Sequence, residues 1–172
     1  AIDYALQIAR GLAAAHERSL GAADARVDSR AAVAANNLAW NYAAHGKGNL
    51  DEAVRLAQTV VQRNPNVAGF VDTLGWVYYK KNLYGAAVEQ LRKAVALDEA
   101  AARVTNVSPS PTYQYHLGMA LKGNGDRGGS QQALQAALRL SEKRPFPDAE
   151  EAKKALGTQK SFEKSVELGG KN

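Results

Sequence analysis

The sequence has no cysteine, few aromatic residues and no long apolar run, and each shortage excludes a class of protein. Without cysteine, neither disulfide bonds nor thiolate metal sites can form in this chain. No apolar stretch reaches the roughly 20 residues that cross a bilayer, so we expect no membrane insertion. Alternating runs of strand-forming residues are also missing. What is present is alanine, the strongest helix former, within a hydrophobic content of 45%. An all-α fold is therefore predicted.

Charge of one sign is not concentrated anywhere in the chain. There are 22 lysines and arginines against 17 acidic residues, a formal net charge of +5. The basic residues are scattered among acids, as in LRKAVALDEAAAR at 91–103, rather than gathered into a stripe. A nucleic-acid-binding protein uses such a stripe to neutralise phosphates. We therefore expect a mixed, solvated surface and no nucleic-acid partner.

Two short stretches of the sequence repeat one another. NNLAWNYAAH at 36–45 and DTLGWVYYKK at 72–81 share the pattern Leu-small-Trp-x-Tyr, with equivalent residues 36 positions apart. A third, weaker copy begins at Leu117. Each copy is followed by small or apolar residues at offsets of 4 and 3, which place them on one face of a second helix. These sets are Ala53, Ala57 and Val60; Ala87, Leu91 and Ala94; and Ser130, Leu134 and Ala137. The pattern predicts three helix–turn–helix units.

This pattern resembles the tetratricopeptide repeat, a helix–turn–helix module of about 34 residues. Leu38, Ala39 and Tyr42 match the first-helix signature, and the sets above match the second-helix signature. Pro65 stands where the family favours a proline at the end of a unit. The resemblance implies a right-handed α-solenoid in which each unit packs mainly on its neighbours. The repeated stretches are also similar to C-terminal repeats of large bacterial proteins of this family, some of which accompany exopolysaccharide assembly and surface-protein sorting.

We expect the chain to divide into seven segments. They are a partial preceding repeat helix with its connector at 1–31, units at 32–67, 68–101 and 111–144, an inserted loop at 102–110, a capping helix at 145–157 and a flexible tail at 158–172. The loop is predicted because Leu74 and Leu117 are 43 residues apart, about nine more than the repeat period. Such a loop is either a tolerated mobile insertion or a contact site.

The two tryptophans do not lie on the stripe that packs within each unit. A residue two places after Leu38 is about 200° further round the helix, so Trp40 points away from that stripe, and Trp76 does likewise. Stacking aligns these rings along the inner surface of the superhelix, where the resembled family binds peptides. The expected peptide-binding groove consists of Asn36, Trp40, Asp72, Trp76, Tyr79, Lys80, Tyr115 and Met119. The alternative is that the tryptophans only pack between adjacent first helices.

No pattern in the sequence points to catalysis or to a cofactor. His16, His45 and His116 are far apart and no cysteine joins them, so we expect solvated or capping histidines and no metal site. The glycine-rich GNGDRGGS at 123–130 precedes a predicted helix, but it lacks the Gly-Lys-Ser/Thr ending of a phosphate loop. A non-enzymatic protein without cofactors is therefore predicted.

The leading functional prediction is an adaptor that binds a peptide or protein segment in its concave groove. The alternative is a structural spacer or self-association segment of a larger bacterial solenoid, linked to exopolysaccharide or surface-protein export. The chain begins at Ala1 inside an amphipathic pattern, and we expect it to be part of a longer protein. Bacterial cytoplasm and periplasm both remain open as its location.

Overall fold

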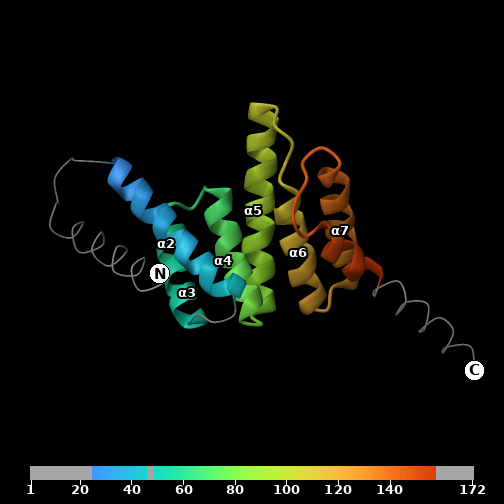
Figure 1. Cartoon of the computed structure of the whole chain (residues 1–172), viewed down its shortest axis with the longest axis horizontal. Helices are drawn as coiled ribbons and strands as arrows, with labels where there is room; N and C mark the ends of the chain where they lie inside the picture. The colour runs from blue at the N-terminus through green and yellow to red at the C-terminus, as the bar shows by residue number, and fades with distance from the viewer. Residues whose placement is uncertain (1–24, 46–48, 158–172) are drawn as a thin grey trace, which may run out of the picture.

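The computed structural model describes residues 25–45 and 49–157 (Figure 1). The helix expected before residue 25, His16 and the tail at 158–172 lie outside the described residues. Within these ranges there are helices and turns but no strand. The helices are α2 (Ala25–His45), α3 (Leu50–Arg63), α4 (Ala68–Lys80), α5 (Tyr84–Thr105), α6 (Pro111–Gly123) and α7 (Arg127–Ser141), followed by a short helix at 149–157.

The helices form three hairpins that stack side by side. α2 pairs with α3, α4 with α5 and α6 with α7, and each hairpin also packs against the next. The first helices of the hairpins touch as well, α2 with α4 and α4 with α6. Figure 1 shows the succession along the long axis of the molecule, from blue α2 to orange α7. This arrangement confirms the all-α solenoid that the repeats predict.

Two glycines explain how closely the paired helices approach. A Cβ atom added to Gly75 in α4 would lie 2.5 Å from Cγ of Leu91 in α5. One added to Gly118 in α6 would lie 2.7 Å from Cγ of Leu134 in α7. Both leucines are fully buried, so neither can move aside into solvent. The small residue of the repeated pattern therefore allows the two helices of a hairpin to pack at this distance.

Local polar contacts cap the N-termini of two helices, and a left-handed residue turns the chain between two others. The side-chain oxygen of Asn49 accepts hydrogen bonds from the backbone N–H groups of Asp51 and Glu52, at 3.0 and 3.2 Å, and so caps α3. Asp126 caps α7 in the same way, accepting from the N–H of Gly129 at 2.8 Å. Between α4 and α5, Asn82 adopts a φ of 60°, a left-handed conformation that turns the chain back.

The inserted segment differs from its prediction. α5 has 22 residues, against 14 in α3 and 15 in α7, and it runs to Thr105. Residues 102–105, predicted as loop, are therefore helical, and the non-helical connection covers only 106–110. The helix ends where Asn106 turns to a φ of 57°. The backbone N–H of Ser110 then donates to Oδ2 of Asp98 at 2.6 Å, which ties the connection back to α5.

The first helix also begins earlier than expected. α2 starts at Ala25, inside the stretch 1–31 that the sequence assigns to a preceding helix and connector. Its first turn contains Asp28, which suits the positive end of the helix dipole. The helical part of the first hairpin is thus longer than a repeat period alone predicts.

The end of the stack is covered by residues 146–157. Phe146, Ala152, Ala155 and Leu156 are buried, and they share one apolar cluster with Tyr115 of α6. The rings of Phe146 and Tyr115 are tilted against each other, with centroids 5.9 Å apart. This segment therefore packs against α6 at the C-terminal end of the described stack.

Candidate functional site

A row of aromatic rings crosses from hairpin to hairpin along the first helices. Trp76 of α4 stacks on His116 of α6, with ring centroids 4.1 Å apart and an interplanar angle of 21°. Trp40 of α2 is tilted against the same imidazole at 5.6 Å. The two tryptophans thus meet around a histidine of the third hairpin. Neither indole is sealed between the two helices of its own hairpin.

His116 is held by a buried carboxylate. Its Nδ1 lies 2.9 Å from both Oδ1 and Oδ2 of Asp72 in α4. Asp72 is 4% exposed and His116 is 1% exposed. Since a carboxylate only accepts, Nδ1 carries the proton and donates it to the pair of oxygens. The hydrogen bond balances the cost of burying the carboxylate between two units.

The expectation of a solvated or capping histidine is wrong for His116. His45 is exposed, as expected, at the end of α2. His116 precedes Leu117 of the third repeat, on a part of α6 that faces α4. Its burial depends on a carboxylate 44 residues earlier in the chain, which no local spacing indicates. The only signal in the sequence was that Asp72 stands among apolar residues on a predicted first helix.

The row continues toward the C-terminal end of the stack. Tyr79, one turn after Trp76, stacks on its indole at 4.6 Å and 17°. Tyr115 of α6 approaches Trp76 at 6.2 Å. Nζ of Lys80 lies 4.9 Å above the Trp76 ring, within reach of a cation–π interaction. Aromatic and cationic groups from two units therefore converge around one indole.

The predicted groove residues divide into three groups by exposure. Three of these residues are buried, namely Asp72, Trp76 and Tyr115, with exposed fractions of 4%, 8% and 6%. Lys80 is exposed. The half-buried members are Asn36, Trp40, Tyr79 and Met119. Trp76 thus serves mainly as packing between α4 and α6, while the five accessible residues, Asn36, Trp40, Tyr79, Lys80 and Met119, form what is called here the inner face.

Asn36 leaves a polar atom without a partner at the start of the inner face. Its Oδ1 is buried, and no hydrogen bond to it is present within the part of the chain that the structure describes. Asn36 precedes Trp40 by one helical turn, so the amide and the indole lie on the same side of α2. An orphaned acceptor costs stability unless a donor reaches it.

Burial keeps the phenols of the row neutral. It raises the pKa of Tyr115 to about 12, with smaller contributions from the nearby charges of Asp148, Tyr79 and Glu151. Burial also raises the pKa of Tyr79, and the neighbouring phenol of Tyr84 acts in the same direction. Both tyrosines therefore present O–H groups that can donate hydrogen bonds at neutral pH.

The arrangement offers little to a reaction. An Asp–His pair also occurs in nucleophilic triads, but there the imidazole must reach a nucleophile beside the substrate. His116 is instead enclosed by Asp72 and two tryptophan rings. Among the described residues, no group of three or more His, Cys, Asp or Glu side chains is placed to hold a metal ion. In the same ranges, every helix is too short or too polar to span a bilayer.

Comparison with known proteins points to one family. Residues 72–100 and 111–144 match the family model described as tetratricopeptide repeat. No curated protein matches the sequence. Several solved structures share the fold, with identities of 20% or less.

Three of these structures illustrate the likeness, and two of them are named for type III secretion. PcrH in complex with the chaperone binding region of PopD is similar with a TM-score of 0.64 and 18% identity, over 84% of this chain and 99% of that one. A type III secretion complex from Aeromonas hydrophila gives 0.63 and 20%, over 95% and 97% of the two chains. The Yersinia enterocolitica translocator chaperone SycD, in an alternative dimer, gives 0.58 and 18%, over 86% and 99%.

Proposed function

This chain is a tetratricopeptide-repeat protein, and from that premise we propose that it is a non-enzymatic scaffold whose inner face binds a peptide or protein segment. The observation that carries the proposal is the placement of Trp40, Tyr79 and Lys80. These side chains stay accessible although the rings beneath them are tightly packed. Aromatic side chains with polar neighbours are typical anchors of peptide recognition.

The buried residues below the inner face give it a rigid support. Asp72, Trp76 and His116 join α4 to α6, so the accessible side chains above them are held in fixed positions before a ligand arrives. Preorganisation of this kind lowers the entropic cost of binding. Lys80 above Trp76 favours a ligand that brings a carboxylate or backbone carbonyl to this point.

The chain's own C-terminal segment limits where a ligand can lie. Phe146 covers Tyr115, and the apolar cluster around them includes Met119 at its edge. The ligand therefore runs along α2 and α4, from Asn36 past Trp40 to Lys80, and ends near Met119. A similar solved structure is a complex of PcrH with a region of PopD, a protein segment, which supports a segment as ligand class.

Peptide display on the immobilised chain tests the proposal. Peptides that bind the wild-type protein are expected to bind a Lys80→Glu variant about tenfold more weakly, since an anchor residue is worth about 1–2 kcal/mol. Lys93→Glu is the matched control, because Lys93 is an exposed lysine of α5 and the charge change is the same. Trp40→Ala should weaken the binding of the same peptides, while the variant still shows a thermal unfolding transition.

Equal loss of binding in Lys80→Glu and Lys93→Glu would assign the effect to net charge and contradict the proposal. Peptides that bind Lys80→Glu and Trp40→Ala as well as they bind the wild type would contradict it too.

Self-association is a second proposal, favoured by the dimer named for the similar SycD structure. A second copy would cover exposed apolar side chains such as Val33 on α2, which is 45% exposed. Light scattering over a range of protein concentrations tests it. A mass that stays at one chain throughout would exclude self-association.

A further inference from the structure

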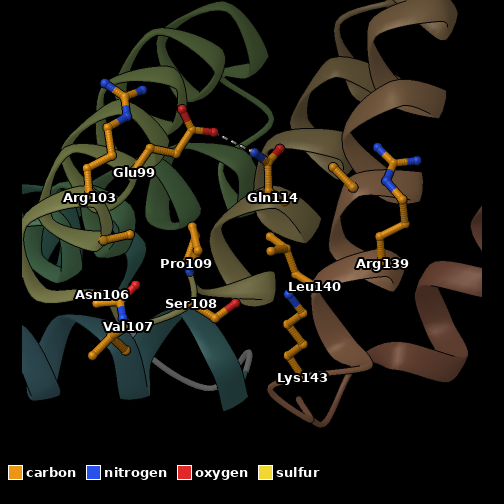
Figure 2. Close-up of a pocket in the computed structure, with 12 residues that line it drawn as sticks. Glu99, Arg103, Asn106, Val107, Ser108, Pro109, Gln114, Arg139, Leu140 and Lys143 are labelled. Atoms are coloured by element: carbon orange, nitrogen blue, oxygen red, sulfur yellow. Dashed lines mark hydrogen bonds between the residues drawn. The ribbon is translucent and has the colours of Figure 1, made fainter.

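A pocket lies between α5 and α7, on residues that the inner face does not use. Its volume is about 810 Å³, within the range of natural ligand pockets. α5 contributes Glu99, Ala102 and Arg103, and α7 contributes Ala136, Arg139 and Leu140, with Lys143 just after its end. Figure 2 shows these two helices on either side of the pocket, with Gln114 of α6 and the 106–110 connection between them.

The insertion in the sequence builds this pocket. The extra residues after the second unit lengthen α5 to Thr105 and then form the connection at 106–110, so they supply both one wall and one end. The connection is held on two sides: Asp98 accepts from the backbone of Ser110 at 2.6 Å, and Arg144 donates to the carbonyl oxygen of Ser108 at 3.4 Å. The two helices and the tied connection therefore form an open surface pocket.

The rim of the pocket carries three cations. Arg103, Arg139 and Lys143 are exposed side chains, and in the described ranges none of them takes part in an ion pair. The one acidic side chain of the lining, Glu99, accepts a hydrogen bond from Gln114 at 3.4 Å across the floor (Figure 2). The pocket thus has an excess of positive charge that its own residues do not neutralise.

The lining is also partly apolar. Leu140 and Pro109 are half-buried, and Val107 is 58% exposed beside them. A nucleic-acid backbone offers phosphates and sugars but no aliphatic group that could pack on this apolar surface. A peptide carries aliphatic side chains next to its carboxylates. The combination of charge and apolar area favours a protein segment over a nucleic acid.

We propose that this pocket binds an acidic segment of a partner protein. Carboxylates of the segment pair with Arg103, Arg139 and Lys143, and an aliphatic side chain between them packs on Leu140 and Val107. The chain's own residues 158–172 are a poor occupant, because their three lysines outnumber their two glutamates. The proposal is independent of the ligand of the inner face.

The test uses random peptides of about a dozen residues, displayed and selected on the full chain, then resynthesised with a fluorescent label for anisotropy measurements. The selection is expected to enrich peptides rich in Asp and Glu around one aliphatic residue. The double variant Arg139→Glu/Lys143→Glu should bind them at least about tenfold more weakly, as expected when two exposed ion pairs become repulsions.

Arg63→Glu/Lys93→Glu is the matched control. Arg63 stands in the last turn of α3 as Arg139 does in α7, and Lys93 is exposed as Lys143 is. The two double variants therefore change the net charge by the same amount at comparable surface positions. Binding by the control should change less than about twofold, and circular dichroism should show both variants folded. Equal weakening in both double variants, or no enrichment of acidic peptides, would overturn the proposal.

Two further measurements separate the alternatives. A labelled single-stranded oligonucleotide that binds in a pocket-dependent manner, where acidic peptides do not, would show the site to be a nucleic-acid site and overturn the proposal. Lys80→Glu should leave the acidic peptides bound as tightly as before. If the affinity of the acidic peptides depends on Lys80 and not on Arg139 and Lys143, the peptides bind the inner face, and that result overturns the pocket assignment.

Discussion

Nδ1 of His116 lies 2.9 Å from both carboxylate oxygens of Asp72, although 44 positions separate the two residues in the chain. The pair joins the first helix of one hairpin to the first helix of the next, beneath the stacked ring of Trp76. In a solenoid each unit contacts mainly its neighbours, so stability depends on such junctions between units. This buried polar contact therefore affects both the stability of the stack and the position of the inner face.

Removing the imidazole should destabilise the protein strongly. His116→Ala leaves the carboxylate of Asp72 buried without its donor, and the loss from breaking a buried pair is about 3–5 kcal/mol. Urea unfolding followed by circular dichroism measures the change. His45→Ala, at an exposed histidine, should stay within about 0.5 kcal/mol of the wild type. Similar small effects in both variants would contradict a stabilising role for the Asp72–His116 contact.

Adding one methyl group at a hairpin seam should be unfavourable. Gly75→Ala gains up to about 1 kcal/mol of helix propensity, but its Cβ would lie 2.5 Å from Leu91. Overpacking of this kind costs about 1–3 kcal/mol, so we expect a net loss of stability. Gly85→Ala in α5 is the control, because its nearest neighbouring atom is 3.9 Å away. A more stable Gly75→Ala variant would show that α4 and α5 can move apart easily.

The C-terminal cap should contribute to stability through Phe146. Phe146→Ala removes a buried ring that packs on Tyr115, and a loss of about 3 kcal/mol is expected for such a truncation. Thermal and urea unfolding measure it. Val104→Ala is a suitable comparison, because Val104 is 87% exposed and should change stability little. If the two variants unfold alike, residues 146–157 do not act as a cap.

Two tyrosines should titrate late in the folded protein. Burial raises the pKa of Tyr113 and of Tyr115 to about 12, from an ordinary value near 10. Since the folded state holds these protons more tightly, the stability they contribute is complete below about pH 10 and is lost as the pH rises toward 12. Absorbance of tyrosinate against pH measures this, and Tyr115→Phe should remove one late step. Titration of all tyrosines near pH 10 while the protein remains folded would contradict it.

The hairpins could be predicted because their determinants are close together in the sequence. Gly75 and Leu91 belong to one unit, and the spacing of small and apolar residues predicts which faces of the two helices pack together. The same helical geometry directs Trp40 and Trp76 away from the stripe within each hairpin, and both rings contact His116 of the third hairpin. How deeply each ring is buried could not be predicted, because it depends on the neighbouring unit. Trp76 is covered by His116 of the next hairpin, whereas Trp40 is only half-buried.

The amino-acid order alone determined that this chain forms stacked helical hairpins, because a period of small and apolar residues encodes contacts within each unit. Only the tertiary structure decided that His116 is buried against Asp72, that Phe146 covers Tyr115, and that the insertion forms the wall of a basic pocket. The physical reason is that these contacts join different units. Their distances depend on how the units are rotated and stacked, and no local period carries that information.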